Sequence, residues 1–87
     1  MNIKYIGQFS KHFKQRIKPY SPLLSSYAER INLFIKSPKH PLLKDHKLKG
    51  KKNELRAFSI TGDIRVVYFI EDNTIHFIDI GTHNQVY

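Results

Sequence analysis

The last third of the sequence limits the fold most, because runs of β-branched and aromatic residues alternate there with short polar breaks. The breaks are Thr61-Gly62-Asp63 and Glu71-Asp72-Asn73, and the runs around them cover residues 55–60, 64–70 and 74–80. Runs of this length between such breaks predict three successive strands joined by tight turns.

Four polar side chains have unusual positions in this region. Arg56 and Arg65 lie inside the predicted strands, although solvated loops are the ordinary place for arginine, while His83 and Tyr87 follow the last strand directly. Guanidinium groups bind phosphate with two parallel hydrogen bonds, and imidazole and phenol groups can donate further ones. The region is therefore a candidate platform for binding a phosphate group.

The first half of the sequence predicts one short strand and two helices. Residues 2–6 alternate well enough for a strand, either at a sheet edge or beside a strand of the last third. A helix over residues 8–18 is indicated by apolar residues four apart: Phe9, Phe13 and Ile17. A second helix, from Ser21 to Lys36, has apolar residues at helical spacing: Leu24, Tyr27, Ala28, Ile31, Phe34 and Ile35. This spacing favours core positions for the aromatic side chains over a stacking surface for bases.

The order strand, helix, helix, loop and three strands predicts an α+β fold in a single domain, residues 1–87. In this β-α-α-β-β-β arrangement, a helical hairpin covers one face of a mostly antiparallel sheet and leaves the other face free. A period of two places Arg65 on the face opposite Val66, and it places Arg56 on the same face as Phe58.

The charge of the chain is distributed unevenly. Fifteen Lys and Arg against seven Asp and Glu give a net charge of +8, with +11 in residues 1–52 and −3 in residues 53–87. Seven lysines fall in a long loop expected over residues 36–52, which leucines are expected to hold against the domain: Leu42, Leu43 and Leu48. Such asymmetry favours a polyanionic partner, and long loops in compact domains are usually functional. A lysine-rich surface that only keeps the protein soluble is the alternative.

Several function classes lack their motifs in this sequence. There is no cysteine, and the five histidines show no metal-ligand spacing, so neither a metal nor another cofactor is expected. Neither a glycine-rich phosphate loop nor a GxSxG elbow occurs. No apolar run approaches the roughly 20 residues that cross a bilayer, and no signal peptide is apparent, so a soluble cytoplasmic protein without membrane contact is expected.

Metal-independent cleavage of RNA is a reaction that the remaining side chains can support. It needs a base for the 2′-hydroxyl proton, an acid for the leaving 5′-oxygen and cations for the charge on phosphorus. The candidates are His46, Asp63 and His83 for proton transfer, Arg56 and Arg65 for the phosphate, and Tyr87 as a hydroxyl donor or stacking ring.

Simpler roles stay open for three of these residues. Asp63 can be a turn residue. Arg56 can pair with Glu54 or Asp79 across the sheet. His46 can be one more solvated residue of the basic loop.

Four segments of the second half form a recognisable set. They are Asp45-His46-Lys47-Leu48-Lys49-Gly50, Leu55-Arg56-Ala57-Phe58-Ser59-Ile60, Gly62-Asp63-Ile64-Arg65-Val66-Val67-Tyr68 and Ile80-Gly81-Thr82-His83-Asn84-Gln85-Val86-Tyr87. As a set they resemble the RelE/ParE superfamily of bacterial type II toxins, and within it the YafQ-like branch. The length of the chain and the order of its elements resemble this superfamily as well.

The resemblance implies a small ribonuclease that cuts mRNA, typically in the ribosomal A site, and that a cognate antitoxin holds inactive. By position, His46, Asp63 and His83 match residues of the YafQ-like active site, and Tyr87 matches a terminal aromatic residue. Arg65 matches a phosphate-binding arginine of the RelE branch. Arg56 matches a basic position of that branch and would contact RNA. Four lysines of the basic loop would contact RNA as well: Lys47, Lys49, Lys51 and Lys52.

One position departs from the YafQ-like pattern. Ser59 stands where that pattern has a catalytic histidine, which leaves His46 and His83 to carry out both proton transfers. Two alternatives therefore stay open. One is a ParE-like, non-enzymatic inhibitor of DNA gyrase, against which the ending GTHxxVY argues; the other is a weakly active or inactive relative that only binds RNA and its antitoxin.

Overall fold

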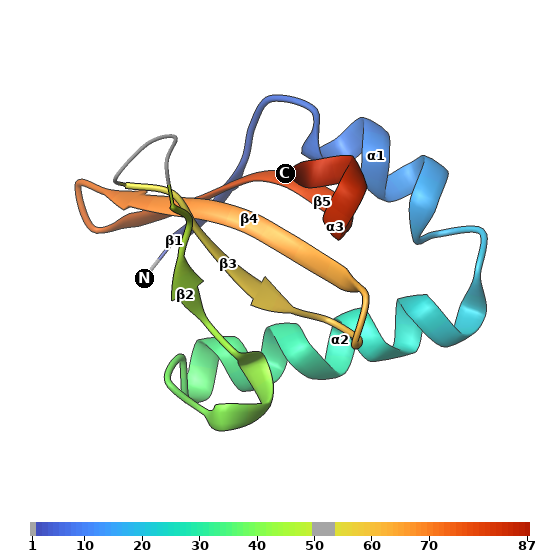
Figure 1. The fold of residues 1–87 in the computed structure, drawn as a ribbon, viewed down its shortest axis with the longest axis horizontal. Helices are drawn as coiled ribbons and strands as arrows, with labels where there is room; N and C mark the ends of the chain where they lie inside the picture. The colour runs from blue at the N-terminus through green and yellow to red at the C-terminus, as the bar shows by residue number, and fades with distance from the viewer. Residues whose placement is uncertain (1, 50–53) are drawn as a thin grey trace.

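The computed structural model describes residues 2–49 and 54–87, and the expected order of elements is confirmed (Figure 1). The elements are β1 (Asn2–Tyr5), α1 (Phe9–Arg16), α2 (Ser21–Lys36), a 3-10 turn (Pro41–Leu43), β2 (His46–Lys47), β3 (Arg56–Ser59), β4 (Ile64–Glu71), β5 (Thr74–Thr82) and α3 (His83–Val86). Three short elements were not expected from the sequence, namely the 3-10 turn, β2 and α3. All three are too short to show a period.

The strands form one sheet in the order β1-β5-β4-β3-β2. β1 runs parallel to β5, and the other three pairs are antiparallel, so the expected α+β fold with a mostly antiparallel sheet is confirmed. The N-terminal strand lies at the edge, beside the last strand of the chain. Two tight turns connect β3, β4 and β5, and the second turn has Asp72 and Asn73 in the left-handed region at φ 53° and 58°.

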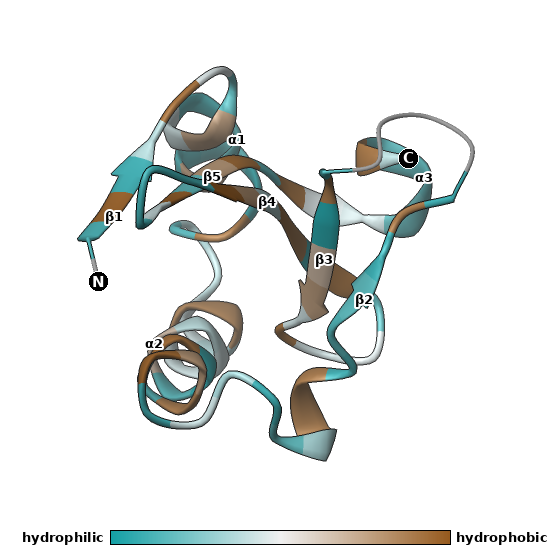
Figure 2. Cartoon of the chain, turned by 90° about the vertical axis from the view of Figure 1, so that its left-hand side faces the viewer, coloured by the Kyte–Doolittle hydropathy of each residue, from teal (hydrophilic) through white to brown (hydrophobic). Residues whose placement is uncertain are grey.

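Helix α2 covers one face of the sheet, and α3 lies on the other (Figure 2). The Phe34 ring of α2 stacks on Phe58 with 4.4 Å between the ring centres, and it meets Tyr68 edge-on at 5.2 Å. All three rings are almost fully buried. They form the centre of the core, because large rings bury the most apolar area per residue.

Helix α1 packs against β5 and against the second helix. Phe9 contacts Phe77 with 5.5 Å between the ring centres, and Phe13 meets Tyr27 edge-on at 4.8 Å. The expected core positions Phe9, Ile17 and Phe34 are buried. Three expected core positions of α2 are exposed, however: Leu24, Ala28 and Ile35. The expected positions Tyr27 and Ile31 do pack against the core, as does Leu23, because the apolar stripe of the helix is wider than its contact with the sheet.

The basic loop is held to the domain by Leu43, which is completely buried, whereas Leu42 is exposed. Lys44 adopts a left-handed conformation with φ 50° and ends the 3-10 turn, and β2 follows. The segment around His46, expected to be aperiodic, is therefore a strand at the sheet edge. Within the described residues, none of the helices has the length and apolar character needed to cross a membrane.

Candidate active site in the cleft between β2 and α3

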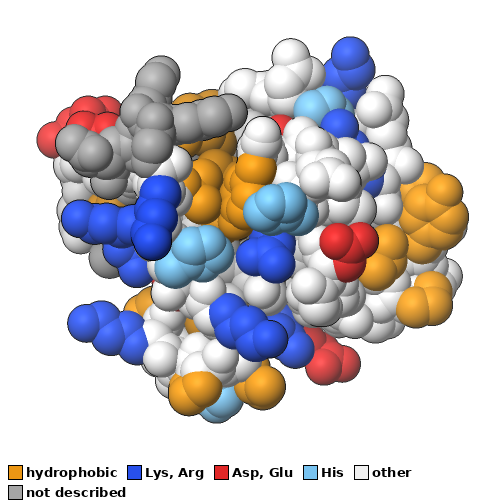
Figure 3. All heavy atoms as spheres, viewed as in Figure 1, with side chains coloured by type: hydrophobic (Ala, Val, Ile, Leu, Met, Phe, Trp, Pro, Cys, Tyr) orange, Lys and Arg blue, Asp and Glu red, His pale blue; other side chains and the backbone are white. Residues whose placement is uncertain are grey.

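A cavity of about 550 Å³ lies between β2 and α3, and we call it the β2–α3 cleft. Its lining combines basic, imidazole and apolar side chains: His46, Lys47, Leu48, Lys49, Leu55, Val67, Ile78, Asp79, His83, Val86 and Tyr87. Histidine, Lys and Arg side chains gather with apolar ones on the face that Figure 3 presents. The cleft therefore unites five of the residues singled out by the sequence: His46, Lys47, Lys49, His83 and Tyr87.

The sheet itself brings distant residues of the cleft into one row. His46 of β2 is the register partner of Ala57, Ala57 is the partner of Val67, and Val67 is the partner of Asp79. Register partners on neighbouring strands project from the same face of a sheet. A basic edge, an apolar floor and a carboxylate thus lie side by side across four strands.

The end of the chain forms the other wall of the cleft. The His83 ring meets the Tyr87 ring edge-on with 4.5 Å between their centres, and the Arg65 guanidinium lies 5.8 Å from the centre of the Tyr87 ring. This distance permits a cation–π interaction. Among the described residues, Arg65 Nε and Tyr87 Oη are buried polar atoms without a hydrogen-bond partner. Each atom therefore has an unused hydrogen-bonding capacity next to the cleft.

Helix α3 is fixed by contacts at its start. The Gln85 side-chain oxygen accepts a hydrogen bond of 2.8 Å from the Thr82 backbone N–H, and Arg16 Nη1 donates to the Ile80 carbonyl oxygen at 2.9 Å. A Cβ atom at Gly81 would lie 2.6 Å from Gln85 Oε1 and 2.7 Å from Arg16 Nη1. A side chain at this position would make both of these flexible side chains shift, so glycine allows them to keep their contacts at the start of α3.

His46 has a defined tautomer in this geometry. Its Nδ1 lies 2.9 Å from the Lys44 carbonyl oxygen, which can only accept, so Nδ1 carries the proton. The strand that carries His46 is held by the hydrogen bond from Leu48 N–H to the Leu55 carbonyl oxygen, at 3.0 Å. In the neutral ring, Nε2 is then the acceptor and can take a proton from a ligand.

The structure does not bring Arg56 to the cleft. Arg56 is the register partner of Tyr68, on the α2 side of the sheet, and its Nε donates to Asp45 Oδ1 at 2.9 Å. The Tyr68 hydroxyl donates to the other oxygen of Asp45. Burial lowers the pKa of Arg56, but the hydrogen bonds and charges of Tyr68 and Asp45 outweigh it and raise the pKa. Burial raises the pKa of Tyr68, and Asp45 raises it further.

The remaining sequence candidates lie elsewhere. Asp63 is exposed in the turn between β3 and β4, where its backbone N–H donates to Thr61 Oγ1 at 3.2 Å, and it does not line the cleft. Lys51 and Lys52 lie outside the described residues. Ser59 is buried, and it is the register partner of Arg65.

The sequence reasoning did not assign Asp79 to the site, nor its two partners from α1. His12 Nδ1 lies 2.5 Å from Asp79 Oδ1, and Arg16 Nη1 lies 3.6 Å from the same oxygen. The feature that could have indicated Asp79 is a change in the spacing of the buried apolar positions along β5. These positions are Ile75, Phe77 and then Ile80, so the spacing changes from two residues to three. A β-bulge opposite Val67 and Tyr68 causes this change and turns Asp79 to the cleft face.

The cleft has the groups needed for proton transfer next to an anion. Two imidazoles, two lysines and a neighbouring guanidinium suit acid–base chemistry on a phosphate ester. In the part of the chain that the structure describes, no three His, Asp or Glu side chains are close enough together to hold a metal ion.

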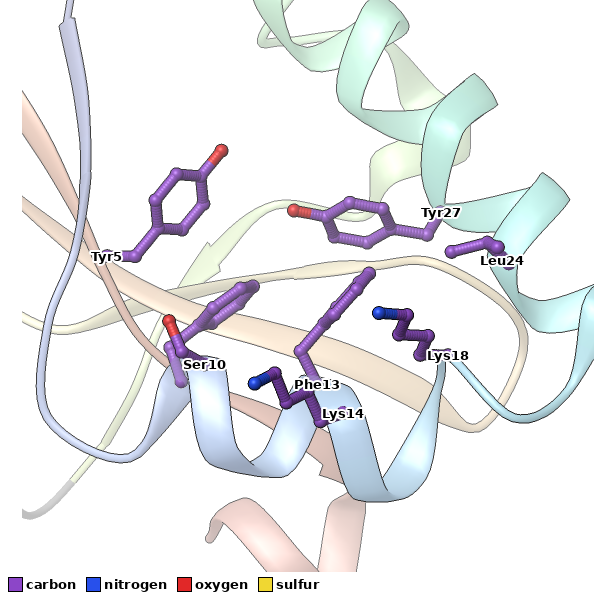
Figure 4. Close-up of a pocket in the computed structure, with 8 residues that line it drawn as sticks. Tyr5, Ser10, Phe13, Lys14, Lys18, Leu24 and Tyr27 are labelled. Atoms are coloured by element: carbon purple, nitrogen blue, oxygen red, sulfur yellow. The ribbon is translucent and has the colours of Figure 1, made fainter.

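A second cavity, of about 440 Å³, lies between α1, α2 and β1 (Figure 4). Its lining consists of aromatic, aliphatic and lysine side chains with one serine: Tyr5, Phe9, Ser10, Phe13, Lys14, Lys18, Leu24 and Tyr27. The hydroxyl ends of Tyr5 and Tyr27 point toward each other across it (Figure 4). Burial raises the pKa of Tyr27, and Tyr5 raises it further. This lining holds no histidine or carboxylate, so the β2–α3 cleft is the better candidate for catalysis.

Solved structures of known proteins share the fold of this chain. A metal-bound toxin from Helicobacter pylori is 30% identical, with a TM-score of 0.77 and an alignment covering 100% of this chain and 99% of that chain. The E. coli DinJ-YafQ toxin-antitoxin complex contains a chain that is 24% identical, with a TM-score of 0.77; the alignment covers 99% of this chain and 96% of that chain. A YoeB/ParE toxin from Agrobacterium tumefaciens is 18% identical, with a TM-score of 0.78; the alignment covers 95% of this chain and 99% of that chain.

No curated protein sequence matches the chain significantly. The model of one protein family matches residues 1–87; this family is described as the bacterial toxin of type II toxin-antitoxin system, YafQ. This match spans every element of the sheet and both walls of the β2–α3 cleft. The chain therefore belongs to the YafQ family of bacterial type II toxins.

Proposed function

We propose that the chain is an endoribonuclease that cleaves mRNA, in the ribosomal A site, by acid–base catalysis without a metal. The observation that carries this proposal is that His46 and His83 line one cleft from opposite walls. Two imidazoles on either side of a bound phosphodiester can share the two proton transfers of RNA cleavage. The net charge of +8 favours RNA as the ligand.

In the proposed reaction, Nε2 of His46 takes the proton of the ribose 2′-hydroxyl. The 2′-oxygen then bonds to phosphorus while the bond from phosphorus to the 5′-oxygen breaks, and protonated His83 gives its proton to that leaving oxygen. The products are a 2′,3′-cyclic phosphate and a 5′-hydroxyl end. The tautomer of His46, with Nδ1–H donating to the Lys44 carbonyl, supports the role of base.

Other residues of the cleft would bind rather than transfer protons. Arg65 would stabilise the charge that develops on phosphorus, and the Tyr87 ring would stack on a base. Lys47 and Lys49 would contact neighbouring phosphates. We assign Arg56 the role of holding the basic loop through Asp45, because it faces the other side of the sheet.

We propose a cognate antitoxin as the second partner. The E. coli relative was crystallised in a complex with DinJ. An acidic antitoxin would be attracted by the +11 charge of residues 1–52, and covering the cleft would stop cleavage. Action on translating ribosomes also places the protein in the cytoplasm.

A second candidate function is binding of RNA with little or no cleavage. It is favoured by Ser59, whose hydroxyl cannot replace an imidazole as an acid or base at neutral pH. Ser59 is buried beside Arg65 in the sheet, so no solvent-exposed group takes the place of the missing histidine at that position.

The test is cleavage of mRNA on purified ribosomes by wild type, His46→Ala and His83→Ala. Each variant is expected to lose about 100-fold or more in cleavage rate, since a positioned acid or base contributes about 10²–10⁴-fold. His76→Ala is the matched control, because His76 stacks on Phe69 outside the cleft lining and its loss should leave the rate within about threefold. Wild type that binds ribosomes without cutting would support the second candidate.

A further inference from the structure

Asp79 is the one carboxylate among the described residues that line the β2–α3 cleft. The charged side chains beside it in the lining are Lys47 and Lys49, and the other titratable groups are His46, His83 and Tyr87. An ionised carboxylate has no proton to donate and can only accept hydrogen bonds. Asp79 therefore gives the cleft a fixed, negatively charged acceptor, which nothing else in this lining provides.

One oxygen of this carboxylate is already occupied. Asp79 Oδ1 lies 2.5 Å from His12 Nδ1 and 3.6 Å from Arg16 Nη1, and it accepts from the Ile80 backbone N–H at 2.8 Å. His12 must be the donor, since the carboxylate can only accept. Within the described chain, the other oxygen, Oδ2, takes part in no hydrogen bond, and the side chain is 22% exposed.

These contacts fix the carboxylate and offset its charge, but they leave one oxygen available to a ligand. A phosphate group is repelled by a carboxylate, whereas N–H groups of a nucleobase are attracted to it. The apolar side chains of the cleft can contact the flat ring of a base, and the Tyr87 ring can stack on it. These apolar residues are Leu55, Val67, Ile78 and Val86.

We propose that Asp79 selects bases that present an amino group, such as cytosine or adenine, over uracil in the RNA that the cleft binds. The inference rests on the proposed function, because it needs RNA in this cleft. Asp79 accepts a hydrogen bond from the amino group through Oδ2. Uracil presents a carbonyl oxygen at the position of the cytosine amino group, so two acceptors would face each other and the carboxylate would be left unpaired.

Asp79→Asn gives a sharp test of this arrangement. The donors of His12 and of the Ile80 backbone would hold the amide oxygen at the place of Oδ1. The amide NH₂ group then occupies the place of Oδ2 and donates instead of accepting. The variant should therefore lose the preference for cytosine and favour uracil, while the contact with α1 is kept.

The experiment measures the binding of fluorescent octamers of 2′-O-methylcytidine and 2′-O-methyluridine at low salt. These probes lack the 2′-hydroxyl group and cannot be cleaved by the proposed reaction. Wild type should bind the cytidine octamer about tenfold tighter, as expected for one hydrogen bond to a charged group. Asp79→Asn should abolish or reverse this ratio. Asp72→Asn, which removes the same charge from the turn between β4 and β5, should keep the wild-type ratio.

Equal affinities of wild type for the two octamers, or an unchanged ratio in Asp79→Asn, would overturn the inference, as would a failure of both octamers to bind. Should Asp79→Asn not fold, as judged by thermal melting, the wild-type ratio alone decides. A tenfold preference without any cleavage of mRNA would keep the inference and reject the proposed nuclease. Cleavage of mRNA by wild type without this preference would reject the inference on Asp79 and keep the proposed nuclease.

Discussion

The Arg65 guanidinium lies 5.8 Å from the centre of the Tyr87 ring, so a cation in the middle of the sheet meets the last residue of the chain. We expect Arg65→Met to lower the rate of mRNA cleavage by about 10²–10³-fold, the usual loss when one donor to a developing negative charge is removed. Arg65→Lys should retain part of the rate, because it keeps the charge but not the two parallel N–H groups. Thermal melting should show both variants folded; a rate unchanged in Arg65→Met would exclude the proposed role.

Tyr87 is expected to act through its ring more than through its hydroxyl. Tyr87→Ala should raise KM about tenfold or more, since stacking of a base on an aromatic ring contributes about 1–3 kcal/mol. Tyr87→Phe keeps the ring beside His83 and should stay within about threefold of wild type. Steady-state cleavage of mRNA on purified ribosomes by both variants measures the difference. Equal losses in the two variants would transfer the role to the hydroxyl group.

The buried Tyr68 should make the domain sensitive to alkaline pH. Burial and Asp45 raise its pKa in the folded protein, so between pH 10 and 12 the unfolded chain loses a proton that the folded chain keeps. The free energy of unfolding should therefore fall as pH rises through this range, by at most about 1.4 kcal/mol per pH unit for each such tyrosine. Tyr27, whose pKa is also raised, contributes in the same direction.

Urea unfolding at pH 8, 10, 11 and 12 tests this expectation. Tyr68→Phe should show a shallower fall in stability above pH 10 than wild type. Tyr20→Phe is the control, because Tyr20 is 56% exposed and its removal should leave the slope unchanged. Parallel curves for Tyr68→Phe and wild type would contradict the assignment.

The contact between Asp45 and Arg56 is expected to serve stability rather than catalysis. Asp45→Asn weakens the hydrogen bonds from Arg56 and Tyr68, and we expect it to lower the free energy of unfolding by about 1–3 kcal/mol. The cleavage rate of the folded variant should fall far less than in Arg65→Met, because the pair lies on the α2 side of the sheet. A loss as large as that of Arg65→Met would place Arg56 in the reaction.

Much of the fold could be predicted because the strands follow a period of two and the helices a period near four. This periodicity placed Arg65 opposite the buried row of Ile64 and Val66, and the structure confirms it. It also placed Arg56 on the face of Phe58, which is the face that α2 covers. Alternation within single strands does not relate the faces of two strands, so both arginines were expected in one site; the register between β3 and β4 puts them on opposite faces.

The site was less predictable, because short elements and an irregular register assemble it. Strand β2 has two residues and α3 has four, so neither shows a period. Asp79 faces the cleft only because of the β-bulge in β5. Without the bulge, Ile78 would be the register partner of Val67; with it, Asp79 is the partner. An alternating pattern would have put Asp79 on the buried side with Phe77. The neighbouring His12 comes from α1, and no local pattern connects it to β5.

The most direct test of the account maps the 5′ ends of transcripts in cells after brief induction of the wild-type chain or His83→Ala. The account predicts new ends in phase with codons within translated regions for wild type, and few such ends for His83→Ala at equal protein level. Growth arrest by wild type without new transcript ends, or with inhibition of DNA gyrase instead, would contradict it.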